Sequence, residues 1–438
     1  MSIIMKLFLY VFLGVSIIMI FQYLIGILKT ITYMRQAKEN DNMIPNKKVS
    51  MLITIPVLRE QSIICDTIEY FSKLKCNNVV IHLCIAGTKR EYESLSKYGK
   101  TKGTIEVVKK FCANKSWENG FTVDYFEADD VEQGDRATQL NYAVKSFIKK
   151  QIPVDVIGVY DADSRPSEGT LLEVAYRYLG NMHCSYQQPA FFMDAVCEMS
   201  KKKENPLLIA NALYQNTWSI ISEIPMWINY SESCGAGKGN FYCIGHGEFF
   251  DVETYKEFEF PEHEVTDGIQ IGYRLGMSGQ DVKILSNYCS DDVPHDLKSL
   301  IGQHRRWFGG CMRLKQAYSW CKEYRKQAKL GTLISGYWSQ FRWAFTANLY
   351  LLSLIISCGL SLERQHIFLV VALILGLIYC YLFPLIGVMV TPYKGKKKVS
   401  FVSFLCVPLA IYIKGIGPNI YIFNTLMKRK NTYGKVER

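Results

Sequence analysis

The sequence predicts an α/β domain with a mostly parallel sheet, held to a membrane by apolar helices on both sides of it. Strand-like apolar runs alternate with helix-like segments between residues 49 and 161, which is typical of a parallel sheet covered by helices on both faces. Apolar segments long enough to cross a bilayer flank this region at residues 7–28, 343–362 and 367–390. The chain is therefore expected to combine a water-exposed middle with membrane-embedded ends.

Positive charges around the first apolar segment predict its orientation. Only Lys6 precedes the segment, whereas five basic residues follow it, namely Lys29, Arg35, Lys38, Lys47 and Lys48. Positive residues favour the cytoplasmic side of a membrane, so the middle of the chain is expected in the cytoplasm. The segment has no small-residue cleavage site and exceeds the length of a signal-peptide core, so we expect a retained anchor in a plasma membrane.

The cysteines and the net charge argue against two other classes of protein. The fourteen cysteines form no C-x-x-C pair, so neither a disulfide framework nor a zinc site is indicated. The net charge of +11 comes from lysines and arginines that gather mostly at the membrane flanks. We therefore expect contact with anionic lipid and nucleotide phosphate, and no binding of nucleic acid.

The elements of the middle region follow from apolar runs and the turns between them. Val49–Pro56 is an apolar run of strand length, and Pro56 and Glu60 mark the turn into a helix. Further strands are expected over residues 79–86, 122–126, 154–160 and 186–189, and helices over residues 62–74, 135–149, 168–179 and 207–227. The regular alternation up to residue 160 is what indicates a parallel sheet.

The strand over residues 154–160 leads directly into Asp161-Ala162-Asp163. In an open α/β sheet the ligand binds at the carboxyl ends of the strands, where these two acids are expected. Two carboxylates suit Mg²⁺ or Mn²⁺, which usually shares its remaining positions with phosphate. The alternative is a surface turn with two solvated acids.

A Gly-rich segment covers residues 233–248. Glycine allows the backbone to turn sharply and to approach a ligand closely. The segment is expected to form either a flexible loop beside an acceptor sugar or a tight structural turn. In the first case His246 is the side chain that we assign to acceptor binding.

Asp267 precedes a helical pattern over the following residues. One interpretation is an N-cap or first-turn acid that the helix dipole stabilises. The other is a general base that removes a proton from a substrate hydroxyl.

Gln303, Arg306 and Trp307 lie within five residues of one another. Arginine suits phosphate oxygens because its guanidinium forms a rigid fork, and tryptophan suits the apolar face of a sugar ring. The alternative is a basic interfacial helix, with arginine at lipid headgroups and tryptophan at the membrane boundary.

Taken in order, these motifs resemble family 2 glycosyltransferases of the cellulose, chitin and hyaluronan synthase type. The most specific match is Q-x-x-R-W at Gln303, Arg306 and Trp307, and D-x-D at Asp161 and Asp163 comes next. Weaker matches are Pro56-x-x-x-Glu60 after the first strand, residues 134–141 as a helix start, and Asp292-x-Pro294 before the tryptophan motif. The resemblance covers residues 49–307, with a similar apolar tail beyond.

The resemblance implies a Rossmann-like GT-A fold and a nucleotide diphosphate sugar as donor, with a UDP-sugar expected. It implies that Asp161 contacts the nucleotide and that Asp163 holds Mg²⁺ or Mn²⁺. It also assigns the other residues of these motifs to the two substrates: Pro56, Glu60 and Arg306 to the nucleotide sugar, and Gln303 and Trp307, together with His246, to the acceptor.

The chain departs from the pattern of this family at two places. Residues 86–89 read Ala-Gly-Thr-Lys where the family offers an Asp-rich segment to the nucleotide. The base motif Thr-Glu-Asp of the family reads Thr266-Asp267-Gly268 here. We assign the general base to Asp267, with Glu264 as the reserve candidate, because one carboxylate must lie near the acceptor.

The membrane segments limit the choice of acceptor. Residues 343–362 and 367–390 are clear spans, whereas residues 399–413 and the sequence Lys-Gly-Ile-Gly-Pro at 414–418 predict a broken or re-entrant segment. Three or four helices of about 10 Å diameter are few for an enclosed polymer channel. We therefore expect single transfers to a lipid-linked or short glycan acceptor in polysaccharide synthesis, in a bacterial plasma membrane.

Two alternatives remain open at this stage. One is a processive polysaccharide synthase with export, and the other is a membrane-anchored pseudoenzyme that binds a nucleotide sugar. Contact with membrane lipid is expected in every case, and the sequence is compatible with a homo-oligomer. The division expected is an anchor at 1–30, a linker at 31–48, a GT-A domain at 49–325, an interfacial segment at 326–342, a membrane region at 343–427 and a basic tail at 428–438.

Overall fold

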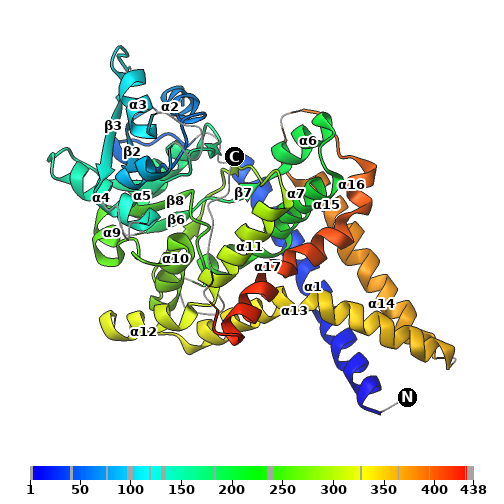
Figure 1. Cartoon of the computed structure of the whole chain (residues 1–438). Coiled ribbons are helices and arrows are strands. Elements are labelled where there is room, and N and C mark those ends of the chain that lie inside the picture. The colour runs from blue at the N-terminus through cyan, green and yellow to red at the C-terminus, as the bar shows by residue number, and fades with distance from the viewer. Residues whose placement is uncertain are drawn as a thin grey trace.

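The computed structural model places a sheet-based domain beside a group of long helices (Figure 1). Helices α1 (Ile3–Glu39), α13 (Leu330–Leu362) and α14 (Ile367–Leu377) extend away from the sheet. The structure describes residues 3–39, 43–74, 77–95, 102–117, 120–129, 135–181, 184–233, 241–325, 328–363, 365–393, 395–429 and 431.

Seven strands form the central sheet, in the order β3-β2-β1-β4-β8-β6-β9. Their bounds are β1 Val49–Pro56, β2 Val79–Thr88, β3 Phe121–Ala128, β4 Val156–Val159, β6 Ser185–Gln187, β8 Glu248–Asp251 and β9 Val282–Ile284. Four neighbouring pairs are parallel, whereas β8 runs antiparallel to both β4 and β6. The predicted α/β fold with a mostly parallel sheet is confirmed, and β1 begins and ends at the predicted residues.

Alternate residues of β1 supply apolar side chains to both faces of the sheet. Leu52 packs with Phe147 on one face, and Ile53 packs with Phe71 on the other. The covering helices are α4 (Arg136–Ile148) on the first face and α2 (Ile64–Ser72), α3 (Thr104–Cys112) and α5 (Thr170–Gly180) on the second. Because helices cover both faces, the ends of the strands are the part of the sheet left for a ligand.

The chain after β4 adds a small sheet and the helices that connect the main sheet to the long helices. The small sheet has the order β5-β10-β7, with β5 Arg165–Pro166, β7 Ala190–Phe191 and β10 Cys289–Ser290. The helices are α6 Met193–Lys202, α7 Pro206–Trp218, α8 Ile224–Glu232, α9 Val252–Phe258, α10 Asp267–Ser278, α11 Leu297–Cys311 and α12 Leu314–Tyr324. A π-helical turn, Ser219–Glu223, joins α7 to α8, so the predicted helix over residues 207–227 is nearly continuous.

Three helical stretches among the described residues are long and apolar enough to cross a membrane: Ile3–Arg35, Leu330–Leu362 and Ile367–Val390. The third consists of α14, a π-helical turn at Ile378–Leu382 and α15 (Phe383–Val390). The predicted membrane segments at both ends of the chain correspond to these three stretches.

Two helices extend beyond the apolar segments that the sequence delimits. Helix α1 continues to Glu39, so the first part of the predicted linker is helical. Residues 330–342, predicted to be a separate interfacial segment, form the first turns of α13. In both cases the helix simply continues, because no proline lies between the apolar stretch and the end of the helix. The predicted basic tail lies outside the described residues from 432 onward.

The predicted break at residues 414–418 is wrong, because α17 (Val407–Leu426) runs through Pro418 without interruption. Proline has no N–H, so the carbonyl of Lys414, four residues earlier, loses its partner in the helix. The indole Nε1 of Trp343 donates to that carbonyl at 3.2 Å. This contact from α13 satisfies the freed oxygen and allows the helix to continue. The chain breaks instead at Cys406, between α16 (Phe401–Leu405) and α17.

Candidate active site

Arg136, the first residue of α4, joins three of the predicted segments. Its guanidinium donates to Asp161 Oδ1 at 3.0 Å, to the carboxylate of Asp267 and to the backbone oxygen of Gly245. Burial alone would lower the pKa of Arg136, but Asp267 and Asp161 together hold it above its ordinary value. The D-x-D motif, the start of α10 and the end of the Gly-rich segment therefore meet at one side chain.

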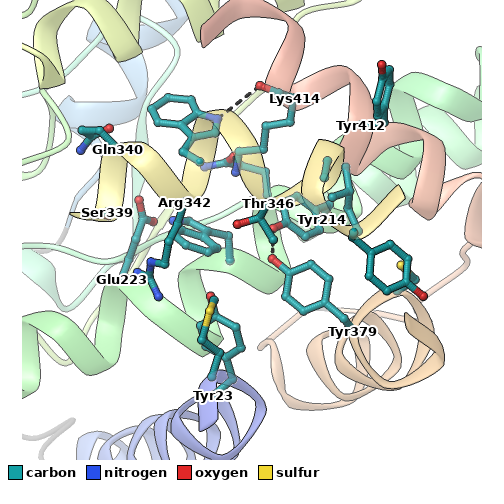
Figure 2. Close-up of a pocket in the computed structure, with 18 of the residues that line it drawn as sticks. Tyr23, Tyr214, Glu223, Ser339, Gln340, Arg342, Thr346, Tyr379, Tyr412 and Lys414 are labelled. Atoms are coloured by element: carbon teal, nitrogen blue, oxygen red, sulfur yellow. Dashed lines mark hydrogen bonds between the residues drawn. The ribbon is translucent and has the colours of Figure 1, made fainter. Parts of the chain in front are cut away.

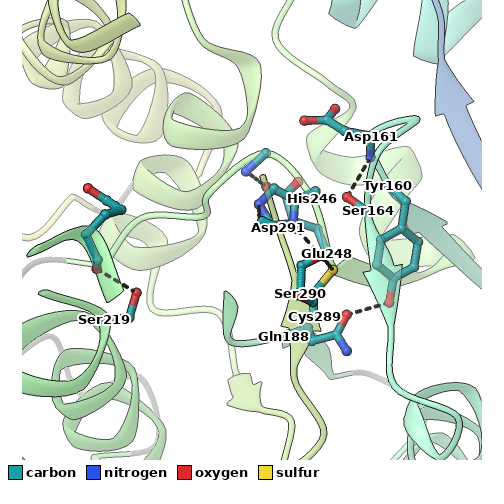
Figure 3. A network of polar contacts seen from close by, with 12 residues as sticks. Tyr160, Asp161, Ser164, Gln188, Ser219, His246, Glu248, Cys289, Ser290 and Asp291 are labelled. Atoms are coloured by element: carbon teal, nitrogen blue, oxygen red, sulfur yellow. Dashed lines mark hydrogen bonds and ion pairs between the residues drawn. The ribbon is translucent and has the colours of Figure 1, made fainter. Parts of the chain in front are cut away.

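The D-x-D motif lies in a turn directly after β4. Ala162 points into the core, whereas Asp161 and Asp163 are partly exposed. The backbone N–H of Asp161 donates to Ser164 Oγ at 3.3 Å, which holds the turn closed (Figure 3). Thus both carboxylates stand at the carboxyl end of a central strand, as predicted from the sequence.

Next to this turn, His246 forms a hydrogen-bonded pair with Asp291 (Figure 3). The distance from His246 Nε2 to Asp291 Oδ2 is 2.8 Å. Burial disfavours the charged imidazole, but Asp291, Asp161 and Asp163 outweigh this effect and raise the pKa of His246 to about 9. The loop at His246 therefore faces the D-x-D turn and is positively charged at neutral pH.

Two sets of side chains near this point offer donor atoms to a metal ion. The D-x-D turn offers carboxylate oxygens, which Mg²⁺ and Mn²⁺ prefer. The ligand atoms of His246, Cys289 and Asp291 also lie within 4.8 Å of one another. Cysteine ligates as thiolate, yet burial raises the pKa of Cys289 well above its ordinary value, and its thiol donates to Asp291 Oδ1 at 3.2 Å. The oxygens of the D-x-D turn therefore fit a hard divalent ion better.

The two candidate bases lie in different surroundings. Asp267 is the first residue of α10, and Arg136 binds its carboxylate. Glu264 instead accepts a hydrogen bond from Arg313 at 2.7 Å. Of the two, Asp267 is the one that the structure joins to Asp161.

The predicted residues of the first strand lie along the same edge of the sheet. Pro56 is the last residue of β1. It lies next to Asp161, because the N–H of Tyr160, the residue before Asp161, donates to Thr54 O of the same strand at 3.0 Å. Glu60 lies one turn further on, where its N–H donates to Thr104 Oγ1 at 3.0 Å.

The Q-x-x-R-W motif lies on α11. Trp307 lines a cavity, and its ring lies 5.8 Å from the buried ring of His304. Gln303 and Arg306 are partly buried on the same helix. Of these three motif residues, Trp307 alone is among the described residues that line the cavity.

This cavity has a volume of about 690 Å³ and extends from Trp307 and His246 into the group of long helices. Its walls come from α1, α7, α13, α14 and α17 and include many aromatic side chains (Figure 2). A few charged groups face it, among them Glu223, Arg342 and Lys414. The volume is that of a typical site for an organic ligand.

Lys414 shows how these charges are held in an apolar wall. Its Nζ donates to Gln215 Oε1 at 3.2 Å and lies 4.7 Å from the ring centre of Tyr214. The cation therefore has a polar partner and several aromatic neighbours, since its Nζ also lies 5.1 Å from the ring centre of Trp218 and 6.0 Å from that of Trp343. The cavity wall can accept an amphipathic molecule with an anionic group.

The comparison with protein families decides the class of this chain. Residues 156–389, more than half of the sequence, match the model of glycosyl transferase family group 2. The chain belongs to this family. It is therefore a glycosyltransferase, and the matched region of this family group 2 enzyme contains both the D-x-D turn and the Q-x-x-R-W helix. A comparison with curated proteins finds no match.

One solved structure agrees with the GT-A fold of the enzyme, and others are similar at lower scores. A mannosyltransferase, PcManGT from Pyrobaculum calidifontis in complex with GDP-Man and Mn²⁺, matches with a TM-score of 0.50 at 11% identity, over 94% of this chain and 99% of that chain. TarS 1–349 from S. aureus matches with a TM-score of 0.40 at 12% identity, over 87% and 92% of the two chains. The complex of TarS 1–349 with UDP-GlcNAc matches with a TM-score of 0.32 at 12% identity, over 63% and 71%.

Sequence reasoning missed two residues of the site in this family group 2 enzyme. Arg136 lies within the helix start that the sequence singled out, residues 134–141, but its partners are 25 and 131 positions away. Glu248 is fully buried beside Asp267 at the start of β8. Only its position at the end of the Gly-rich segment pointed to it. Residues 234–240 of that segment lie outside the described residues.

Proposed function

We propose that this chain is an inverting glycosyltransferase of the polysaccharide-synthase type. It moves a sugar from a nucleotide diphosphate sugar, preferably a UDP-sugar, to a lipid-linked or short glycan acceptor at the cytoplasmic face of a bacterial plasma membrane. The observation that carries the proposal is the cavity that extends from His246 and Trp307 to the long apolar helices. An acceptor held in the bilayer would reach the D-x-D end of the sheet through this cavity.

The donor would bind at the carboxyl edge of the sheet, where Pro56, Glu60 and Asp161 gather. Asp161 would contact the nucleotide, and Arg306 would approach the diphosphate from α11. The exposed position of the D-x-D turn supports this arrangement, since 39% of the Asp161 side chain is accessible. A pseudoenzyme would bind a donor at the same open edge, so turnover must be measured.

The oxygens of the D-x-D turn would hold Mg²⁺ or Mn²⁺, with Asp163 as the ligand. When bound, such an ion neutralises the negative charge that develops on the leaving diphosphate. The positive charge of His246 lies beside the same turn and would contribute in the same direction.

The transfer itself would proceed in one displacement. Asp267 would take the proton of the acceptor hydroxyl while the oxygen of that hydroxyl attacks the anomeric carbon. The bond from the anomeric carbon to the diphosphate breaks, and the nucleoside diphosphate leaves with the electron pair. Attack from the face opposite the leaving group inverts the anomeric configuration. Trp307 would stack on the acceptor sugar, with Gln303 beside it, and hold the hydroxyl in line.

The test is release of nucleoside diphosphate by detergent-solubilised protein with a panel of nucleotide sugars and membrane extract as acceptor. We expect turnover of one donor, abolished by Asp163→Ala and by chelation. Asp124→Ala is the matched control, because Asp124 pairs with Lys150 away from the site and its loss should leave the rate unchanged.

The products separate the alternatives. Label in a lipid-extractable or short product supports the proposal, whereas polymer of high molecular weight from the purified chain supports processive synthesis. Binding of a donor without turnover in the full panel would establish the pseudoenzyme.

A further inference from the structure

Two basic side chains, Arg342 of α13 and Lys414 of α17, line the cavity between the long helices (Figure 2). The Nζ of Lys414 donates to the neutral amide of Gln215, and aromatic rings surround the rest of the ammonium group. Arg342 has no hydrogen-bond or ion-pair partner among the described residues, and its Nε is buried. Within the part of the chain that the structure describes, no anion is therefore bound to either cation.

The acid among the described residues of the lining, Glu223, is bound to other groups. Its two carboxylate oxygens accept hydrogen bonds from Tyr242 Oη at 2.8 Å and from Ser219 Oγ at 3.1 Å. It forms no ion pair with a described basic residue, Arg342 and Lys414 included. A charge in apolar surroundings costs stability unless an opposite charge or several polar groups compensate for it. An anionic ligand would supply that compensation to the two cations.

Helix α13 offers further polar groups beside Arg342. Ser339, Arg342 and Thr346 are spaced by three and four residues, so they share one face of the helix, and all three line the cavity. Gln340 lines it as well, with a side chain that is only 4% exposed and an Oε1 that has no hydrogen-bond partner among the described residues. Guanidinium and hydroxyl groups placed in this way can donate to several oxygens of one phosphate.

The cavity becomes apolar further along α13. Leu351 and Leu354 line it there, and Phe12 and Met19 of α1, which pack in the same apolar cluster as Leu354, line it too. Leu354 follows Arg342 by 12 residues, which is about 18 Å along a helix at 1.5 Å per residue. This part of the wall suits a hydrocarbon chain.

The two cations lie between this apolar part and the proposed acceptor-sugar site. The indole of Trp343 donates to Lys414 O, and its ring lies 6.1 Å from the ring of His304. The ring of His304 in turn lies 5.8 Å from that of Trp307, which is proposed to stack on the acceptor sugar. The order along the cavity is therefore sugar site, positive charge and apolar wall. A sugar joined to a lipid through phosphate has its parts in the same order.

We propose that the acceptor is a lipid phosphate, and that its phosphate binds between Arg342 and Lys414. This inference rests on the proposed glycosyl transfer and narrows its acceptor to lipids that carry the glycan through a phosphate ester. The phosphate takes no part in making or breaking a bond. It anchors the acceptor, so that the hydrocarbon chain lies along α13 and the glycan reaches Trp307.

The first experiment measures binding of hexadecyl phosphate to the full-length protein in a neutral detergent. Tryptophan fluorescence reports it, because the rings of Trp218 and Trp343 lie 5.1 and 6.0 Å from Lys414 Nζ. Hexadecanol and inorganic phosphate should each bind at least about tenfold more weakly, because each lacks one half of the ligand. Arg342→Gln and Lys414→Gln should each weaken binding of hexadecyl phosphate about tenfold, as expected for loss of a charged hydrogen bond. Arg342→Lys and Lys414→Arg keep the charge and should retain most of the affinity.

Lys29→Gln is the matched control. Lys29 lies on α1 and pairs with Glu232 at 3.1 Å, outside the described lining of the cavity. This variant should bind hexadecyl phosphate as the wild type does. If all three glutamine variants bind it equally well, the two cations hold no phosphate and the proposal fails. If the cavity variants do not fold, the wild type decides, because binding of hexadecanol as tight as that of hexadecyl phosphate would also overturn the proposal.

The second experiment distinguishes an acceptor from a lipid that is merely bound. Wild-type protein labels lipid from membrane extract with the donor found in the panel. The labelled lipid should be retained by an anion-exchange resin in organic solvent, and hexadecyl phosphate should inhibit its formation without changing KM for the donor. A labelled lipid that the resin does not retain would overturn the inference and leave glycosyl transfer intact. Binding of hexadecyl phosphate by protein that turns over no donor would refute the proposed function, and with it the assignment of the lipid phosphate as acceptor.

Discussion

Replacing Glu248 by glutamine should change how the stability of the protein depends on pH. Burial, together with the charge of Asp267, raises the pKa of Glu248 from 4.5 to about 7. Between these two values the folded protein binds more protons than the unfolded chain, so stability falls as the pH rises through this window. At 1.36 kcal/mol for each pKa unit, the loss is about 3 kcal/mol and is complete above pH 7. Glutamine has no charged form, so the variant should not show this loss.

The assay is urea unfolding of the detergent-solubilised proteins, followed by tryptophan fluorescence at pH 5 and pH 8, with chelator present in all samples. The free energy of unfolding of the wild type, relative to that of Glu248→Gln, should be lower at pH 8 than at pH 5 by about 3 kcal/mol. Using differences between the two proteins removes the contribution of all other titrating groups that they share. An equal pH dependence in the two proteins would refute the claim that burial and Asp267 raise the pKa of Glu248.

Three other substitutions test separate contacts. Gly268→Asp should abolish transfer and lower the free energy of unfolding by about 1–3 kcal/mol, because the new Cβ meets the backbone of Gly245 at 2.4 Å. Both effects can be measured, as kcat and as the melting temperature. A gain in kcat would contradict this expectation. Arg136→Ala should reduce kcat/KM about 100-fold, since it releases Asp161 and Asp267. Arg136→Lys keeps the positive charge and should retain part of the wild-type kcat/KM. Equal values of kcat/KM in the two variants would show that the charge at position 136 does not contribute. Trp343→Phe removes the donor to Lys414 O and should lower the free energy of unfolding by about 1–3 kcal/mol. A thermal melt would detect this loss. An unchanged melting temperature would mean that the Lys414 carbonyl freed by Pro418 needs no such donor.

The fold could be predicted because its signals are local. The apolar run of β1 is buried on both faces of a parallel sheet, and its length and ends follow from the residues themselves. The same holds for the apolar stretches that can cross a membrane, whose length and composition are sufficient evidence. Helix ends were less predictable, since α1 and α13 continue past the apolar residues into polar ones.

The break predicted at Pro418 shows why local signals fail in other places. A proline in a helix normally ends it. Here a side chain 75 positions earlier, Trp343, supplies the hydrogen bond that the helix loses. The sequence of α17 alone contains no sign of that partner. A tertiary contact therefore outweighs a strong local signal.

Some residues of the candidate site have a local signal in the sequence, and others do not. Asp161 and Asp163 could be found because a strand ends directly before them, and position on a sheet determines where ligands bind. Arg136 and Glu248 could not, because their roles depend on the approach of the Gly-rich segment to α10. The sequence showed the absence of an acid at position 268, but only the structure shows that Gly245 and Glu248 fill the space.

Transfer of label from the nucleotide sugar into lipid-extractable product by Ala347→Trp tests whether the acceptor reaches the site through the cavity. Ala347 on α13 lines the cavity, so an indole there should block the path of the acceptor and leave the donor site intact. Val370→Trp, on an exposed part of α14, is the control. We predict that Ala347→Trp loses transfer to lipid while KM for the donor and slow hydrolysis of the donor remain, and that Val370→Trp behaves as wild type. Equal labelling of lipid by both variants would show that the acceptor does not use this cavity.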